Sequence, residues 1–271
     1  MSGIYLSAYC VDFRDYAWLE GAIRSFGQYG VGAELAAGYE REGFDALLEA
    51  QAGRFRDLPV TLHAPFIEWC TVPGSKEEKR AQAEFEKACR LYGDFHASSI
   101  VFHTHEGSFE EGKKEEKRRR SAEVLREFAG RMDRAGMRAT VENVGYPALN
   151  NVLFNEEEFV GLFAVLPPQM GCLVDIGHAL LNGWDMENLI RTLGTRIWGY
   201  HLNQNDGRKD LHFPIYDPRG ICSPGRMDEI LKTIARCSPE ADLILEYAPG
   251  PKISREGLLA DIRRVSRICG K

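Results

Sequence analysis

Residues 171–178 read GCLVDIGH, a short apolar run that ends in an acidic residue and is followed by a histidine. Short apolar runs rich in β-branched residues, with polar turn residues at their ends, predict buried strands. Seven further runs of this kind are spread along the chain. The sequence therefore predicts eight strands, at residues 4–9, 31–35, 60–63, 99–103, 139–142, 171–175, 198–201 and 243–246.

The segments between these runs have the periodicity and composition of helices. They cover residues 15–29, 44–55, 76–95, 115–135, 155–166, 186–193, 227–237 and 255–268. Strands that alternate with helices are parallel and joined by crossovers. Eight units in 271 residues give about 34 residues per unit, which fits a (β/α)8 TIM barrel in the α/β class. A doubly wound open sheet is the competing fold, but no G-x-G-x-x-G turn follows the first strand.

The composition is that of a globular protein. The chain has 34 Lys and Arg against 40 Asp and Glu, a net charge of −6, with 44% apolar and 27% charged residues. These values exclude a disordered chain, a collagen-like chain and a small disulfide scaffold. The mild acidity argues against binding nucleic acid by bulk charge alone. The charged block EEGKKEEKRRR at 110–120 is interpreted as the solvated face of a helix. No linker interrupts the alternation, so a single domain over residues 1–271 is expected.

Cellular location is inferred from what the chain lacks. Its seven cysteines are odd in number and include no C-x-x-C pair, which favours free thiols in a reducing compartment. The N-terminus does not resemble a signal peptide. No apolar stretch approaches the ~20 residues that cross a bilayer. We therefore expect a cytoplasmic protein without a membrane partner.

Metal-binding residue types gather at the ends of the predicted strands. Six of the seven histidines lie at these ends or, like His212, in the loops just beyond them, and His96, near a helix C-terminus, is the exception. The strand-end residues are His63, His103, His105, Glu142, Asp175, His178, His201 and Glu246. Barrel strands meet at one mouth, where clustered carboxylates repel one another unless a cation neutralises them. We therefore predict a site for one to three divalent ions, with manganese, zinc, cobalt or magnesium as candidates.

The loop after the seventh predicted strand adds a second group of ligand-type residues. Asp210 and His212 are two positions apart, so that an extended segment would project both side chains to one side. The alternative interpretation is a polar turn around Asp206-Gly207.

Taken together, the strand ends resemble the xylose isomerase-like barrel superfamily, which includes sugar isomerases and epimerases and the endonuclease IV family. Similarity to the epimerase branch implies a four-ligand metal site made by Glu142, Asp175, His201 and Glu246. It also implies proton transfer by the two glutamates and a substrate contact by His178. The branch usually has an arginine six residues after the seventh-strand histidine, where this chain has Gly207 and then Arg208.

Similarity to endonuclease IV implies three zinc ions and nine ligands. All nine have counterparts here, namely His63, His103, Glu142, Asp175, His178, His201, Asp210, His212 and Glu246. The chain departs at Phe66, where that branch has tyrosine after H-A-P. The stretch 203–214 also resembles the N-D-G-x-x-D-x-H-x-P segment of members named as sugar phosphate isomerases/epimerases. Asp210 and His212 therefore do not by themselves imply a nuclease.

Three functions remain open. The sequence favours a metal-dependent sugar or sugar phosphate isomerase/epimerase, in which Glu142 and Glu246 move protons through an enediolate. The expected substrate contacts are His63, His103, Phe66, Arg208 and Lys209, and Trp69 and Trp184 are either an apolar wall or core residues. The alternative is zinc-dependent phosphodiester hydrolysis of abasic DNA, the only case with a nucleic-acid partner. A non-catalytic barrel ranks last. The sequence does not determine whether the chain forms a homo-oligomer.

Overall fold

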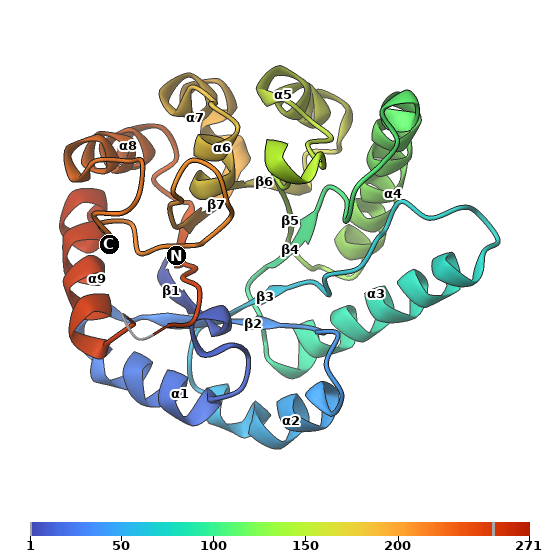
Figure 1. Ribbon diagram of the computed structural model, residues 1–271. Coiled ribbons are helices and arrows are strands. Elements are labelled where there is room, and N and C mark those ends of the chain that lie inside the picture. The colour runs from blue at the N-terminus through green and yellow to red at the C-terminus, as the bar shows by residue number, and fades with distance from the viewer. Residues whose placement is uncertain (1, 251–252) are drawn as a thin grey trace.

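The strands form the closed barrel that the alternation predicts. The computed structural model describes residues 2–250 and 253–271. Each strand pairs in parallel with the next, and the last pairs with the first, so that a ring of strands lies inside a ring of helices (Figure 1). The strands are β1 Ile4–Ser7, β2 Gly32–Ala36, β3 Val60–His63, β4 Ile100–His103, β5 Ala139–Glu142, β6 Met170–Asp175, β7 Ile197–Leu202 and β8 Asp242–Leu245.

Period-two alternation along these strands carries ligand-type residues to the mouth of the barrel. Tyr5, Val101, Leu173 and Ile244 form a buried cluster separate from the main core. A residue two positions after a member of this cluster points to the same side of the sheet, and it lies one level nearer the C-terminal end of the strand. At that level lie the inward residues Ser7, Glu34, His63, His103, Glu142, Asp175 and His201 on β1 to β7, and Glu246 directly after β8.

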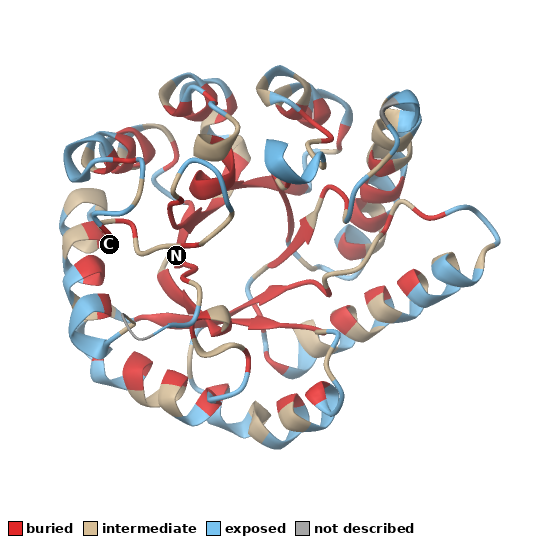
Figure 2. Cartoon of the chain, in the orientation of Figure 1, coloured by how far each residue is buried: buried red, intermediate tan, exposed pale blue. Residues whose placement is uncertain are grey.

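The helices bury one face against the barrel and expose the other (Figure 2). In α7, for example, Met186, Leu189, Ile190 and Leu193 are buried, at the spacing of one helical face. Side-chain caps fix several starts, including a capping box between Asn155 and Glu158. The helices are α1 Tyr16–Ser25, α2 Phe44–Gln51, α3 Lys76–Asp94, α4 Lys114–Arg134, α5 Glu156–Val165, α6 Ile176–Leu181, α7 Met186–Leu193, α8 Pro224–Cys237 and α9 Arg255–Cys269.

Several predicted boundaries differ from the structure, and two features at the mouth show why. β1 ends at Ser7, because the side chain of Ser7 accepts a hydrogen bond from the backbone of Tyr9 and starts the 3-10 helix Ala8–Val11. The segment directly after β6 is the short helix α6, for which no element was predicted from the sequence. The carboxylate of Asp175 accepts from the backbone N–H of His178 at 2.6 Å and so caps this helix.

Several other expectations concern residues away from the mouth. Trp69 and Trp184 belong to the main core, so the cavity-wall interpretation was wrong for both. The charged block begins α4, where Lys117 pairs with Glu68 at 2.6 Å and Arg120 with Glu78 at 3.1 Å. All seven cysteines are free. Within the described ranges, no helix combines the length and apolarity that a membrane span requires.

One buried carboxyl outside the mouth predicts a pH-dependent stability. Burial raises the pKa of Asp261 from 3.8 to about 6, although the Tyr247 hydroxyl donates to it at 2.9 Å. Between these values the folded chain holds a proton that the unfolded chain has released, so stability falls as pH rises through this range. Two pKa units correspond to about 3 kcal/mol, so we expect Asp261→Asn to stabilise the fold by about 2 kcal/mol at pH 7.5.

Urea unfolding at several pH values measures this effect. The advantage of Asp261→Asn should vanish below pH 3.8, where the Asp261 carboxyl is protonated in both the folded and the unfolded chain. Asp228→Asn is the matched control, because Asp228 pairs with Arg264 at 2.6 Å and has a lowered pKa. That variant should be destabilised at pH 7.5. A pH-independent gain for Asp261→Asn would contradict the assignment.

Candidate metal centre

Nine ligand-type side chains at the mouth form three sets. In each set, one donor atom per residue lies within 4.8 Å of all the others. The first set comprises His63, His103 and Glu142; the second, Glu142, Asp175, His201 and Glu246; the third, His178, Asp210 and His212. Glu142 belongs to both the first and the second set. Strand ends that are far apart in sequence are thus brought into one cluster.

In the first set, two imidazoles face each other across one carboxylate. The Nε2 atoms of His63 and His103 are 3.1 Å apart and lie 3.5 and 3.4 Å from Glu142 Oε2. The opposite ring nitrogens are anchored. Nδ1 of His63 donates to the carbonyl of Ala64 at 2.8 Å, and Nδ1 of His103 pairs with the carboxylate of Glu106. Both Nε2 atoms are therefore free to share a cation with Glu142.

In the second set, His201 faces the three carboxylates through its Nδ1 atom. Its Nδ1 lies 3.2 Å from both Glu142 Oε1 and Glu246 Oε2, and 3.9 Å from Asp175 Oδ2. All four residues of the set are buried. Nδ2 of Asn203 donates to Asp175 Oδ2 at 2.6 Å. One imidazole and three carboxylates thus face a common point.

In the third set, Asp210 bridges two histidines. Its oxygens lie 3.1 Å from His178 Nε2 and 3.1 Å from His212 Nε2. His178 stands in the first turn of α6, and its Nδ1 donates to the carbonyl of Asn143 at 3.1 Å. Nδ1 of His212 donates to the carbonyl of Glu246 at 3.1 Å. The far side of each ring is therefore held by backbone.

A folded loop after β7 presents Asp210 and His212 together. Gln204 and Phe213 pair antiparallel, which closes the loop into a hairpin-like segment. The side-chain oxygen of Asn205 accepts from the backbone of His212 at 3.0 Å. The segment is not extended at His212, which has a φ of 44° in the left-handed region. The two side chains do lie together, as the spacing predicts, but a turn brings them there.

Burial and close packing shift the pKa values of these groups. Burial alone would raise the pKa of Glu142, but His201 and His103 hold it well below its usual value. Burial would lower the pKa of His103, but Glu106 and Glu142 raise it to about 10. For Asp175, burial and the neighbouring carboxylates raise the pKa despite His178. Without metal, protonated imidazoles balance the charge of the carboxylates. A bound divalent cation would neutralise the carboxylates directly.

The chemistry of the donor set fits divalent cations. Five imidazoles and four carboxylates are the ligands that zinc and its neighbours in the periodic table prefer. Three buried donor atoms, Glu142 Oε2, His201 Nδ1 and Asp210 Oδ1, have ionic neighbours at 3.1 to 3.5 Å but form no hydrogen bond of good geometry within the described chain. Buried polar atoms are normally hydrogen-bonded, so these three are explained if they bind metal.

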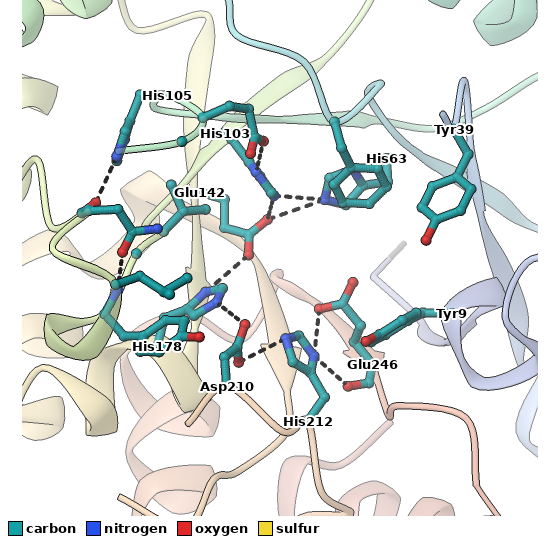
Figure 3. A pocket seen from close by; sticks show the side chains of 18 of the residues that line it. Tyr9, Tyr39, His63, His103, His105, Glu142, His178, Asp210, His212 and Glu246 are labelled. Atoms are coloured by element: carbon teal, nitrogen blue, oxygen red, sulfur yellow. Dashed lines mark hydrogen bonds and ion pairs between the residues drawn. The ribbon is translucent and has the colours of Figure 1, made fainter. Parts of the chain in front are cut away.

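A cavity of about 370 Å³ opens above the three sets (Figure 3). The expected substrate contacts His63, His103 and Phe66 line it. The side chains of Arg208 and Lys209 are exposed, and neither lines this cavity. Sequence reasoning missed Tyr9, Phe13 and Tyr39, which line the cavity from the loops after β1 and β2. No local pattern distinguishes aromatic residues of this kind from core residues.

Sequence reasoning also missed Glu34, a buried carboxylate on β2. Its oxygens lie 3.2 and 3.3 Å from His201 Nε2, on the side of the ring away from the second set. A carboxylate on the far nitrogen fixes the tautomer and orientation of a metal-binding histidine. The signal was a lone acidic residue inside the apolar run 31–35.

We expect Glu34→Gln to weaken metal binding by about 10- to 100-fold. The amide would no longer fix the tautomer that leaves His201 Nδ1 unprotonated toward the second set. Competition with a metal chelator measures the affinity, and circular dichroism checks the fold. Glu40→Gln is the control, because Glu40 is exposed and pairs with Arg80 away from the metal sets. Unchanged affinity in Glu34→Gln would contradict this role.

Fold and site together define a (β/α)8 barrel with a cluster of candidate metal ligands at its C-terminal mouth. The chain belongs to the family of xylose isomerase-like TIM barrels, which it matches over residues 26–260. Members of this superfamily are mostly enzymes, including epimerases, isomerases and endonucleases. No curated protein sequence shows a significant match to the chain.

Solved structures of different activities share the fold. The TTHB071 protein from Thermus thermophilus, soaked with ZnCl2, has 19% identity and a TM-score of 0.69 over 98% of each chain. A D-psicose 3-epimerase from Clostridium cellulolyticum H10 with D-tagatose has 16% identity and a TM-score of 0.67, covering 98% of this chain and 95% of that chain. An AP endonuclease, family 2, from Brucella melitensis has 16% identity and a TM-score of 0.70, covering 95% and 97%. At these identities, the similarity establishes the fold alone.

Proposed function

We propose that this protein is a metal-dependent phosphoester hydrolase with a centre for three divalent ions. The observation that carries the proposal is the geometry of the three sets, two of which share Glu142 and all of which contribute residues to the lining of one cavity. A site that needed only one ion would use the second set alone. The first and third sets would then leave four histidines and an aspartate with no role in binding metal.

The residues at the mouth suit a phosphate group. Bound divalent cations supply positive charge at the phosphoryl oxygens and lower the pKa of a water molecule. The carboxylates and imidazoles of the chain fix where that charge lies, because their far sides are anchored by backbone and by Glu34 and Glu106. In the reaction, water oxygen bonds to phosphorus and the phosphorus–ester oxygen bond breaks. The water proton ends on the departing oxygen, which gives an alcohol and a phosphate.

A sugar isomerase/epimerase is the second candidate. The second set holds four ligands, and the carboxylates of Glu142 and Glu246 flank His201 Nδ1 at equal distances of 3.2 Å. Two glutamates placed in this way are suited to remove a proton from carbon and return it at another position. The cavity, about 370 Å³, also accommodates a small sugar. This function uses one ion and leaves His63, His103 and the third set without a role in binding metal.

Metal content and two substrate assays separate the candidates. We would purify the protein without chelator and measure metal per folded chain by elemental mass spectrometry. The hydrolase predicts two to three ions and metal-dependent cleavage of bis(4-nitrophenyl) phosphate or 4-nitrophenyl phosphate. The epimerase predicts one ion and exchange of a carbon-bound hydrogen of D-tagatose with D2O, followed by NMR. One ion with exchange and no cleavage would overturn the proposed function.

A further inference from the structure

Four aromatic side chains form an arc along one side of the cavity. The arc consists of Tyr9, Phe13, Tyr39 and Phe66, all of which line the cavity. Tyr9 stacks on Phe13 with ring centroids 5.7 Å apart, Phe13 lies 4.8 Å from Tyr39, and Tyr39 meets Phe66 edge to face at 5.9 Å. Figure 3 shows Tyr9 and Tyr39 on the side of the cavity away from His105. The arc is therefore one continuous surface.

Both ends of the arc touch histidines of the metal sets. Tyr9 lies edge-on to His212 with centroids 5.3 Å apart, and Phe66 stacks on His63 at 4.3 Å with an interplanar angle of 18°. A molecule whose phosphate lies at the metal sets would therefore place its remaining atoms against these rings. The arc lies where the ester group of a substrate must be.

The backbone under the arc is held in an unusual conformation. Asp12 and Phe13 both have left-handed φ values, 52° and 51°. Such values in residues other than glycine are costly, and they persist where surrounding contacts enforce them, often at ligand sites. Here Arg41 donates to the carbonyl of Asp12 at 2.9 Å and packs over the ring of Tyr39 at 5.0 Å. These contacts hold Phe13 and Tyr39 toward the cavity.

Lysine and arginine are absent from the described lining of the cavity. The acidic residues Glu106, Glu142, Asp210 and Glu246 do line it. Beside the arc, Arg14 and Arg41 both pair with Asp12, at 2.8 and 3.1 Å. Duplex DNA carries one charge per about 1.7 Å of helix axis, and proteins neutralise these charges with lysine and arginine. The cavity can therefore neutralise the charge of one phosphate, the one that lies at the metal sets.

From the aromatic arc and the absence of lysine and arginine from the described lining of the cavity, we infer that the substrate is a small phosphate ester whose ester group is a flat, apolar ring stacked on Tyr39 and Phe66. This inference rests on the proposed function and names its substrate class. Flat rings gain from stacking and from edge contacts with aromatic side chains beyond the gain from apolar burial alone. Among the described residues that line the cavity, no lysine or arginine is placed to neutralise the further phosphates of a nucleic acid.

Binding of non-hydrolysable phosphonates tests the inference without relying on turnover. Isothermal titration calorimetry on the zinc-loaded protein would compare phenylphosphonate, cyclohexylphosphonate and methylphosphonate. We expect phenylphosphonate to bind about tenfold more tightly than methylphosphonate, as stacking on aromatic side chains provides. Cyclohexylphosphonate, which is apolar but not flat, should fall clearly below phenylphosphonate. Equal affinities for the phenyl and cyclohexyl compounds, or for the phenyl and methyl compounds, would overturn the inference.

Variants of the arc residues test whether the preference for phenylphosphonate arises from the aromatic arc. Tyr39→Leu should remove most of the preference for phenylphosphonate over methylphosphonate and leave methylphosphonate affinity unchanged. Phe66→Leu is the second variant and should act in the same direction. Tyr29→Leu is the control, because Tyr29 is also half-buried but does not line the cavity. A preference that survives in both arc variants would overturn the inference.

The outcomes also separate this inference from the proposed function. If methylphosphonate and phenylphosphonate bind equally and only with zinc present, the phosphoester site stands and the aromatic subsite fails. If neither phosphonate binds the zinc-loaded protein, the proposed function fails, and the inference fails with it. Tighter binding of a duplex oligonucleotide with an abasic site than of phenylphosphonate would overturn the inference alone.

Discussion

Glu142→Gln should abolish metal-dependent activity and lower metal content by more than one ion per chain. Within the described chain, Glu142 is the one residue shared by two sets, and its oxygens face His63 and His103 on one side and His201 on the other. Glutamine keeps the shape but removes the charge that both sets need. Loss of a principal charge-stabilising group costs on the order of 10³-fold in rate, and we expect at least that loss here.

The measurement pairs elemental analysis with the rate of phosphoester cleavage. Glu68→Gln is the matched control, because Glu68 pairs with Lys117 outside the cavity and should leave both quantities unchanged. Near-native circular dichroism would show that the loss in Glu142→Gln is local. Full metal content together with an unaltered rate would contradict the shared-ligand geometry.

Asp210→Asn should separate the two candidate functions most sharply. Asp210 bridges His178 and His212 at 3.1 Å, so that its loss dismantles the third set and leaves the second set intact. A hydrolase that uses all three sets should lose one ion and about 10²- to 10³-fold in rate. An epimerase that uses the second set should keep its ion and most of its hydrogen exchange.

The control variant for this experiment lies in the same loop. Asp206→Asn keeps an oxygen that accepts from the backbone of Arg208 and Lys209, and Asp206 does not line the cavity. Both metal content and rate should stay at the level of the unaltered protein. Loss of every ion in Asp210→Asn would contradict a second set that binds metal independently.

The barrel was predictable because its signals are local. Apolar runs of four to six residues between amphipathic helices identify the strands, and parallel strands must place their C-terminal ends at one mouth. The family resemblance extended this reasoning to nine residues by strand order. Boundaries at the mouth were less predictable, because side-chain caps at Ser7 and Asp175 set them.

Other parts of the site depend on contacts that leave little trace in sequence. Glu34 is one acidic residue in an apolar run, and its role follows only from the 3.2 Å contact with His201, 167 positions away along the chain. Tyr9, Phe13 and Tyr39 are of residue types that are also common in protein cores. Their orientation toward the cavity depends on left-handed backbone at Asp12 and Phe13 and on the Arg41 contact.

The sequence by itself determined the fold class, the position of the mouth and the kinds of ligand there, because period-two alternation and strand order are properties of the chain alone. Only the tertiary structure decided that these residues form three sets, two of which share Glu142, that His201 faces the second set through Nδ1, and that an aromatic arc walls a cavity whose described lining has no lysine or arginine. Donor atoms form a site only when they lie within a few ångströms of one another. Barrel closure, loop turns and side-chain rotamers set those distances, and none of them can be read from residue spacing.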